Sequence, residues 1–374
     1  MHLQSWAARA RRTKYAALPV VVTPGVWYDV TPAGISLDPD YGGAPGSGGN
    51  FGFESVWHDS SNVGTFYAMC HLQGVWKSTD GGVTWTGPIN TGTNGAAITA
   101  SAGCVTGAAT GGIPVLYVNV GRGNLGFYKS TDGGVNWSTT DLSPPLPDGR
   151  EDIYPESVNP YNKDHVLTTA HENNYIIHST DGGATWSNVT MPISPSGGSC
   201  YIFYIDTGNA TTTADTWLLI AQASSVDGTW RTTNAGASWT KVDGNEHTHG
   251  GCQIAQLGGG VIWMTGVYSS LGWGCLRSTD YGATWTHYGP NEGRSVIWGT
   301  SKKIYAMGGG AVQTPVDPGF ISAVAPGTGT WSAESGAAAT YNGGAQMLDQ
   351  YFNGTNNVFI MAMGNSGLQR YVEP

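Results

Sequence analysis

Charged side chains are scarce in this sequence, since Asp, Glu, Lys and Arg together make up 11% of its 374 residues. Only 16 residues are Lys or Arg against 26 Asp or Glu, so the formal net charge is -10. Proteins that bind nucleic acid present clustered basic residues to the phosphate backbone. The low basic content and the acidic balance therefore exclude nucleic acid as the main expected partner.

Long apolar runs are also missing, because no run approaches the roughly 20 residues that a membrane-spanning helix needs. We expect no membrane partner. The first 15 residues contain Arg9, Arg11, Arg12 and Lys14 and no acidic residue. The apolar stretch that follows, Ala16 to Val22, is short for the hydrophobic region of a signal peptide. We therefore expect residues 1–22 to be a leader or tag outside the fold, and residues 23–374 to form a single domain.

Cysteine is infrequent, and its count is odd, so at least one thiol is expected to be unpaired. The positions are Cys70, Cys104, Cys200, Cys252 and Cys275. Four Asn-x-Ser/Thr sequences, which begin at Asn136, Asn188, Asn209 and Asn353, weakly favour a secreted protein. We expect a secreted location.

Glycine and tryptophan, in contrast, are abundant, with 57 and 15 residues. Both occur in an eight-residue repeat, STDGGVTW at residues 78–85. Further copies stand at 130–137 (STDGGVNW), 179–186 (STDGGATW), 232–239 (TTNAGASW) and 278–285 (STDYGATW). The residue types are typical of a tight hairpin turn: the Asp carboxylate accepts hydrogen bonds from turn amides, Gly adopts left-handed backbone angles, and Trp packs on the sheet. We interpret these Asp residues as structural.

The repeat resembles the Asp-box, or BNR repeat, of β-propellers. Its Trp residues are 52, 49, 53 and 46 positions apart, and one more step of 46 reaches Trp331. A seventh unit, at residues 345–371, lacks one strand, which residues 25–30 could supply. The resemblance and the spacing predict an all-β fold, a seven-bladed β-propeller of four-stranded antiparallel blades whose ring is closed by an N-terminal strand.

Strand alternation divides the loops between two faces. The box turn joins the third and fourth strands of a blade, so it shares the bottom face with the loop between the first and second strands. Arg122, Arg150 and Arg294 all fall in loops of the opposite, top face. Arg231, Arg277 and Arg370 instead occupy the strand position that Lys77 and Lys129 fill in other blades, just before the box, and there we expect solvent-facing side chains. The first group predicts a cationic mouth that binds an anionic substrate.

The predicted top face also carries His and Tyr residues that could transfer protons. His71 and His171 end the second strands of two blades, and they are the predicted acid/base pair. Tyr154 or Tyr268 would assist them. Further predicted substrate-binding residues, beside the three Arg, are His247, His249, Tyr341 and Glu54.

These residues favour β-elimination on a uronate, in which Arg neutralises the carboxylate and His or Tyr moves the protons. The chain is similar to seven-bladed polysaccharide lyases, and the implied relatives act on ulvan or on rhamnose-capped glucuronate. The predicted function is therefore a polysaccharide lyase that cleaves an acidic, glucuronate-containing polysaccharide or oligosaccharide as a monomer. The chemistry requires no cofactor, and a structural Ca²⁺ is compatible with it.

Other interpretations stay open. Glycoside hydrolysis, of a sialidase-like or rhamnosidase-like kind, needs a pair of carboxylic acids that the sequence does not single out. Sialidases also have six blades and an Arg-Ile-Pro element that is missing here. Xyloglucan-cleaving relatives use two propellers, for which 374 residues are too few. A binding ring without enzyme activity resembles sortilin-type receptors and photosystem assembly factors. His247 and His249 could instead bind a metal, or the top loops could simply be polar.

Overall fold

The computed structural model describes fifteen segments of the chain, to which every structural statement below refers. They are residues 23–44, 49–100, 103–119, 127–140, 153–170, 173–193, 199–222, 228–244, 253–265, 275–288, 293–298, 303–308, 320–324, 332–333 and 347–374. The predicted leader, residues 1–22, lies outside them. The described segments contain two short helices, α1 (Gly95–Thr99) and α2 (Ala210–Asp215). No described helix has the length and apolar character to cross a membrane.

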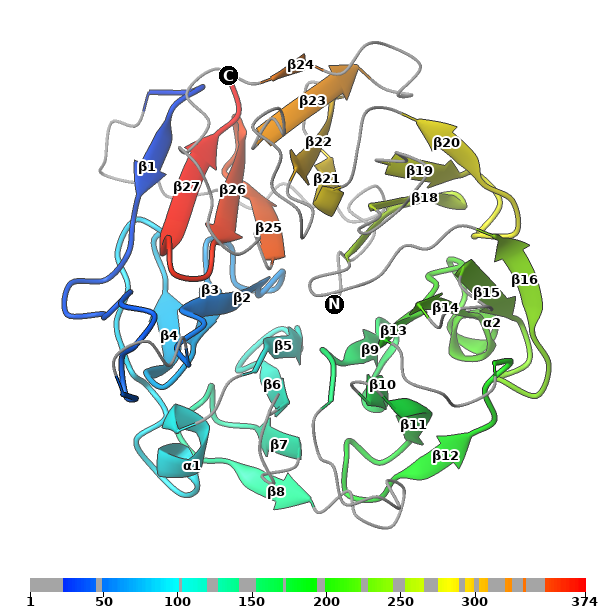
Figure 1. Ribbon diagram of the computed structural model, residues 1–374, viewed down its shortest axis with the longest axis horizontal. Helices are drawn as coiled ribbons and strands as arrows, with labels where there is room; N and C mark the ends of the chain where they lie inside the picture. The colour runs from blue at the N-terminus through cyan, green and yellow to red at the C-terminus, as the bar shows by residue number, and fades with distance from the viewer. Residues whose placement is uncertain are drawn as a thin grey trace.

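The rest of the regular structure is antiparallel sheet, arranged around a common centre (Figure 1). In the first half of the chain, one sheet contains β2 (Phe53–His58), β3 (Phe66–Cys70) and β4 (Gly74–Ser78). The next contains β5 (Val105–Ala108), β6 (Val115–Asn119), β7 (Phe127–Ser130) and β8 (Ser138–Thr140). The third contains β9 (Ser157–Asn159), β10 (Asn162–Ala170), β11 (Asn173–Ser179) and β12 (Ser187–Val189).

The second half continues the same pattern. One sheet contains β13 (Ser199–Tyr204), β14 (Trp217–Gln222), β15 (Gly228–Thr232) and β16 (Thr240–Asp243). Another contains β17 (Ile254–Gly258), β18 (Val261–Thr265), β19 (Cys275–Ser278) and β20 (Thr286–Tyr288). A further sheet contains β21 (Gly293–Trp298), β22 (Lys303–Gly308), β23 (Phe320–Val324) and β24 (Ser332–Ala333). The last combines β25 (Met347–Phe352), β26 (Asn357–Ala362) and β27 (Leu368–Val372) with β1 (Trp27–Asp29).

The all-β propeller of four-stranded antiparallel blades is therefore confirmed, but the prediction of seven such blades is wrong. Six sheets have four strands, and the sheet of β2, β3 and β4 has three. Beyond β4 the chain bonds less regularly: Lys77 and Thr86 exchange both backbone hydrogen bonds, whereas the Val75 amide donates to the side chain of Asn90. Pro88 lies between these contacts and has no amide hydrogen to donate, so a regular fourth strand does not form.

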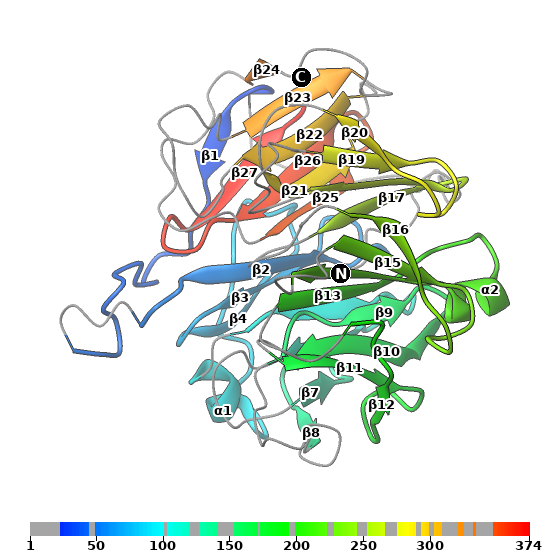
Figure 2. The same cartoon turned by 45° about the vertical axis from the view of Figure 1, so that its right-hand side comes forward.

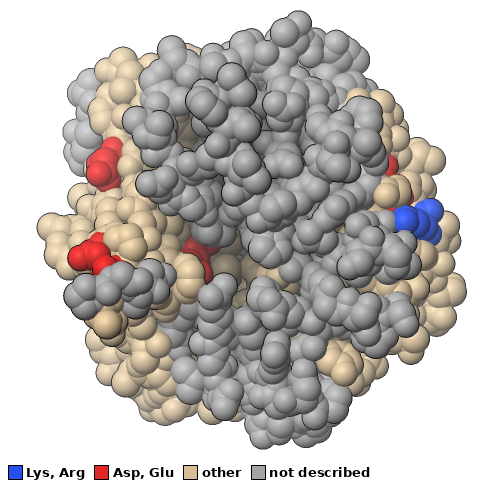
Figure 3. Space-filling view, viewed as in Figure 1, with Lys and Arg blue, Asp and Glu red and all other residues tan. Residues whose placement is uncertain are grey.

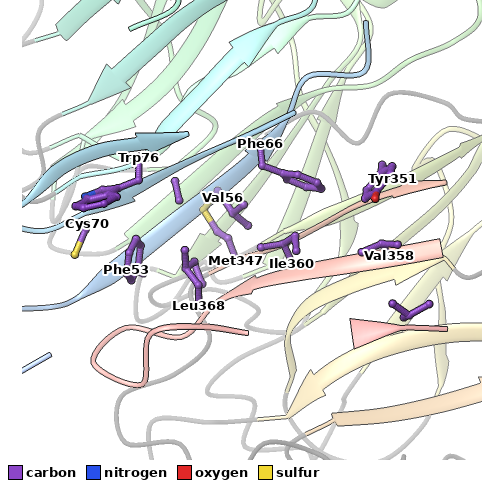
Figure 4. Close-up of a cluster of buried hydrophobic side chains, with 13 residues drawn as sticks. Phe53, Val56, Phe66, Cys70, Trp76, Met347, Tyr351, Val358, Ile360 and Leu368 are labelled. Atoms are coloured by element: carbon purple, nitrogen blue, oxygen red, sulfur yellow. The ribbon is translucent and has the colours of Figure 1, made fainter. Parts of the chain in front are cut away.

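The N-terminal strand pairs with the last sheet, as predicted. Trp27 lies opposite Tyr371, and Tyr28 lies opposite Arg370. The apolar face of this sheet packs against the first sheet, with Phe53, Phe66 and Tyr351 among the side chains buried between them (Figure 4). Burial of each large apolar side chain contributes roughly 1.5–3 kcal/mol, so this contact stabilises the junction of chain start and chain end.

The expected solvent-facing position of Arg370 is wrong. This side chain is 2% exposed, and its Nε donates to the carbonyl oxygen of Gly81 over 2.8 Å. Gly81 belongs to the box turn of the first sheet, so the guanidinium joins it to the last. Arg231 makes the same kind of contact, from Nε to the carbonyl oxygen of Tyr281 in the next sheet's turn, over 2.7 Å. In both cases the Arg side chain bonds to a carbonyl oxygen in a box turn of an adjacent sheet.

The repeated turn has the hydrogen bonds that its residue types predict. In the turn at residues 179–186, Asp181 Oδ1 accepts from the Thr185 amide over 2.8 Å, and Oδ2 accepts from the Thr185 hydroxyl over 2.6 Å. The Ser179 hydroxyl donates to the same carboxylate over 2.9 Å. A box turn also lies beside the loop between the first two strands of a sheet, since the Gly81 amide donates to the carbonyl oxygen of Gly64, between β2 and β3. This contact confirms that the two kinds of loop share one face.

These bonds predict an acid-dependent loss of stability. They lower the pKa of Asp181 to about 2 from its usual 3.8, chiefly through the Thr185 hydrogen bonds. The stabilisation is present above about pH 4 and is lost as the pH falls through about 2. We expect Asp181→Ala to reduce the free energy of unfolding in urea at pH 7 by about 1–2 kcal/mol.

Asp181→Asn is the matched control, because Asn234 occupies the same position in another turn and accepts from the Ser238 amide. This variant should lose less stability than Asp181→Ala, and its free energy of unfolding should fall less than that of the wild type between pH 4 and 2, because Asp80, Asp132 and Asp280 still titrate there. Equal losses for the two variants would contradict the role of the hydrogen bonds.

Candidate functional site

Each sheet has one strand nearest the centre of the molecule, called its first strand below, as β5, β9, β13, β21 and β25 show (Figures 1 and 2). In the last sheet this strand is β25, and β1 lies at the outer edge. Polar side chains of these strands cross to the next sheet. The Ser55 hydroxyl accepts from the Val105 amide over 2.8 Å, and the Ser157 hydroxyl accepts from the Tyr204 amide over 2.9 Å. These hydroxyl groups therefore fix one first strand to the first strand of the next sheet.

The structure describes the side chains of three predicted site residues: His71, Tyr154 and Glu54. Arg294 lies in β21, and its side chain is outside the described part of the structure. The remaining predicted residues fall outside the described segments, namely His171, Tyr268, Arg122, Arg150, His247, His249 and Tyr341. Their roles stay predictions.

His71 directly follows β3 and is largely buried. Its Nδ1 accepts the Phe51 amide over 2.9 Å, and the two rings stack with their centroids 5.0 Å apart. The His71 amide donates to the Gly52 carbonyl oxygen. A ring that accepts through Nδ1 carries its neutral-state proton on Nε2. The predicted acid/base residue is thus held by the segment that leads into β2.

Glu54, in β2, lies in the same corner of the first sheet. Phe53 pairs with Cys70, the residue before His71, so the two predicted residues flank one rung of the sheet. Glu54 is partly exposed, and its Oε2 accepts the Gly103 amide over 2.8 Å. The carboxylate therefore spans from the first sheet to the segment that leads into β5.

Tyr154 lies apart from this corner, before β9. Its ring packs on Tyr201 with the centroids 4.4 Å apart, and its carbonyl oxygen accepts the Thr168 hydroxyl over 2.6 Å. The side chain belongs to a buried apolar cluster with Phe203 and Leu218. Among the three described residues, the structure thus brings His71 and Glu54 together and places Tyr154 in a core.

The sequence interpretation missed Glu156, two residues further along. This side chain is 0% exposed, and burial raises its pKa to about 8 from 4.5. A carboxylic acid with this pKa keeps its proton at neutral pH and can serve as a proton donor. One sequence signal could have identified it, since Glu156 begins the tripeptide Glu-Ser-Val, and Glu54 begins the other copy.

Cys104 connects the two glutamates. Its thiol pKa is raised well above the usual value, first by burial and then by the charges of Glu54 and Glu156. Both carboxyl groups therefore act on one sulfur atom, from different sheets. Glu54 also contributes, after burial, to the raised pKa of the Cys70 thiol. The two glutamates and Cys104, called the carboxyl cluster below, form our candidate site.

One acidic patch lies near the centre of the described surface. In Figure 3 a patch of Asp or Glu atoms lies in a hollow near the middle of the face, and the described Lys and Arg atoms appear only at its edge. Within the described segments, no group of three or more His, Cys, Asp and Glu side chains is placed to hold a metal ion. Cys70 and Cys104 are free thiols.

Comparison of the sequence with known proteins gives one informative relative. No family model matches the chain. A xyloglucanase from Paenibacillus sp. is 28% identical over 269 residues, which represent 66% of this chain and 25% of the xyloglucanase. The chain therefore spans about a quarter of the length of this relative.

Solved structures with similar folds include three propellers. YCF48 from Cyanidioschyzon merolae has a TM-score of 0.55 at 13% identity and covers 93% of this chain and 99% of its own. An ancestral GH74 enzyme has a TM-score of 0.54 at 17% identity, with 92% and 46% covered. The extracellular domain of a putative hybrid two-component system from B. thetaiotaomicron scores 0.56 at 12% identity, with 86% and 40% covered. At these identities the similarity concerns the fold.

The prediction of a polysaccharide lyase is wrong. The sequence relative is a xyloglucanase, and a GH74 enzyme is among the structural neighbours, so the comparisons favour glycoside hydrolysis over elimination. The lyase prediction depended on a cationic mouth and on the absence of an identifiable carboxyl pair. The described structure offers two candidate carboxyl groups, because Glu54 accepts the Gly103 amide beside Cys104, and Glu54 and Glu156 both raise the pKa of the Cys104 thiol.

Burial of Glu156 predicts a pH-dependent stability with the opposite sign to that of Asp181. A carboxyl group whose folded pKa is raised contributes stability below its unfolded pKa, near 4.5, and this stability is lost as the pH rises through about 8. We expect the stability advantage of Glu156→Gln over the wild type to grow between pH 4.5 and 8, by at most about 1.4 kcal/mol per pH unit. Urea unfolding at each pH measures this difference, and a constant difference would contradict the raised pKa.

Proposed function

We propose that this chain is a glycoside hydrolase propeller that cleaves a polysaccharide of the xyloglucan type. The observation that carries this proposal is the 28% identity over 269 residues with a xyloglucanase. The carboxyl cluster supports it chemically, because glycosidic bond hydrolysis uses two carboxyl groups with different protonation states.

The two glutamates suit the two roles. Glu156, protonated at neutral pH, would donate its proton to the leaving oxygen as the bond to the anomeric carbon breaks. Glu54 is partly exposed and accepts the Gly103 amide, a hydrogen bond that favours a charged carboxylate. It would act on the opposite side, as the base for a water molecule or as the nucleophile. His71 would border the site and contact the sugar.

The wider setting follows from the same comparisons. We propose an extracellular location, because one of the similar propellers is an extracellular domain and the xyloglucanase relative acts on a polysaccharide by its name. We also propose that the protein acts as a monomer without a cofactor. The finer ring, in which the three-stranded sheet counts as a seventh blade and β1 closes the circle, is part of the proposal. The pairing of β1 with β27 and the bond from Arg370 to Gly81 support it.

The decisive test is the release of reducing ends from a panel of neutral and acidic polysaccharides that includes xyloglucan. We expect activity on xyloglucan, and we expect Glu54→Gln and Glu156→Gln to lower kcat by at least about 100-fold, the usual contribution of an acid or base. The rate should also fall as the pH rises through about 8, where Glu156 loses its proton.

Asp349→Asn is the matched control. Asp349 is another buried carboxyl of a first strand, and burial raises its pKa to about 7. It accepts the amides of His58 and Gln350, which places it in the junction of the last and first sheets. This variant should keep kcat within a few-fold. Binding of glycans without any new reducing ends would contradict the enzyme and indicate a binding module instead.

A further inference from the structure

We infer that Asn119 is a positioning residue for both carboxyl groups of the proposed hydrolase. This inference rests on the proposed function of Glu54 and Glu156. Asn119 is the last residue of β6 and is 1% exposed. Its described side-chain contacts are to backbone groups and not to a charged group. Any effect of Asn119 on the glutamates is therefore transmitted through its hydrogen bonds.

The side-chain amide of Asn119 forms hydrogen bonds to two different segments. Its Oδ1 accepts the Cys104 amide over 2.6 Å, and its Nδ2 donates to the Ile153 carbonyl oxygen over 2.8 Å. Cys104 leads into β5, and Ile153 leads into β9. One buried side chain therefore fixes the distance between the entrances of two neighbouring sheets.

Each of these entrances leads to one of the glutamates. On one side, the Gly103 amide adjoining Cys104 donates to Glu54 Oε2 over 2.8 Å. On the other side, Ile153 stands three residues before Glu156 in the same short segment. The hydrogen bonds thus run from Glu54 through residues 103 and 104 to Asn119, and from there to the segment that carries Glu156.

The backbone around Asn119 leaves little freedom in this arrangement. The backbone N–H of Asn119 also donates to the Cys104 carbonyl oxygen, over 3.3 Å. A Cβ atom on Gly103 would overlap the Asn119 carbonyl oxygen, so the two segments pass in direct contact. No side chain separates these two backbone segments. A displacement of the Asn119 side-chain amide would therefore also displace the Gly103 N–H and the Glu54 carboxylate that accepts it.

Asparagine suits this position because the buried site needs a side chain with both an acceptor, for the Cys104 amide, and a donor, for the Ile153 carbonyl oxygen. Aspartate would keep the acceptor for the Cys104 amide but would direct a carboxylate at the Ile153 carbonyl oxygen. That change breaks only the connection to the Glu156 side. A negative charge placed there would also raise the pKa of a neighbouring carboxyl group, since like charges disfavour ionisation.

The test uses Asn119→Asp, Asn119→Ser and Asn119→Ala in the full chain, with reducing-end release from xyloglucan as the assay. We expect kcat to fall about 10- to 100-fold with KM changed less than threefold, the size of effect that misplaced catalytic groups produce. In Asn119→Asp the alkaline limb of the pH–rate profile should move to higher pH. Asn119→Ser, which keeps a donor and an acceptor on a shorter side chain, should retain more activity than Asn119→Ala.

Asn90→Asp is the matched control for burial and charge. Asn90 is also a buried side-chain amide that accepts the Val75 amide and donates to the Gly95 carbonyl oxygen and the Thr99 hydroxyl, and none of these hydrogen bonds involves Glu54, Glu156 or Cys104. The Asn90→Asp variant should lower the melting temperature as Asn119→Asp does, without moving the alkaline limb of the pH–rate profile.

The outcomes separate the inference from the function beneath it. A wild type without hydrolytic activity overturns the proposed function and the inference together. An active wild type with inactive Glu54→Gln and Glu156→Gln, but with Asn119 variants of unchanged kcat and pH profile, overturns the inference alone. An equal shift of the alkaline limb of the pH–rate profile in Asn90→Asp would also overturn the inference. So would a failure of all three Asn119 variants to fold, because Asn119 would then serve the general stability of the fold.

Discussion

Side chains that bond to the backbone of the neighbouring sheet are the interaction on which this structure depends. Each sheet satisfies its own backbone groups through its ladders, but its first strand and its turns leave amides and carbonyl oxygens at the junctions. Short polar side chains accept these amides, as Ser55 does from Val105 and Asp349 does from His58. Arginine donates to the carbonyl oxygens, as Arg370 does to Gly81. Apolar packing alone would not fix the sheets in register, because it is not directional.

The candidate site is a consequence of the same interaction. Glu54 resembles the junction residues in that it accepts an amide of the next sheet, and Asn119 extends the connection to a third sheet. Two carboxyl groups from separate sheets thereby act on one thiol, Cys104. A site built in this way needs no rigid loop, because the strands that carry it are already held by their neighbours.

The lyase hypothesis and the hydrolase proposal rest on different residues. The lyase hypothesis started from Arg, His and Tyr in the loops, whose positions follow from counting strands. The hydrolase proposal starts from the xyloglucanase relative and from two glutamates, one in the first strand β2 and one directly before the first strand β9. Loop residues can be assigned to a face from the sequence, but the sequence does not tell how far apart they lie or how well they are solvated. Those two properties decide which groups hold a proton at neutral pH.

Several features could be predicted because they depend on residues close together in the chain. The hydrogen bonds of the turn at Asp181 involve neighbours within four positions, so the octapeptide determines them. The spacing of the repeats predicted the order of the strands and the face of each turn. The missing fourth strand after β4 was not predicted, since it depends on how residues around Pro88 meet an adjacent strand.

The sequence by itself thus determined a propeller with repeated turns, because hydrogen bonds within a turn and alternation along a strand are local properties. Tertiary structure alone decided that Arg370 is buried, that Glu156 has a raised pKa and that Asn119 joins two sheet entrances. Each of these depends on residues 15 to 289 positions away, or on the exclusion of water by another sheet. Solvation and long-range contacts are properties of the assembled molecule, so no pattern along the chain records them.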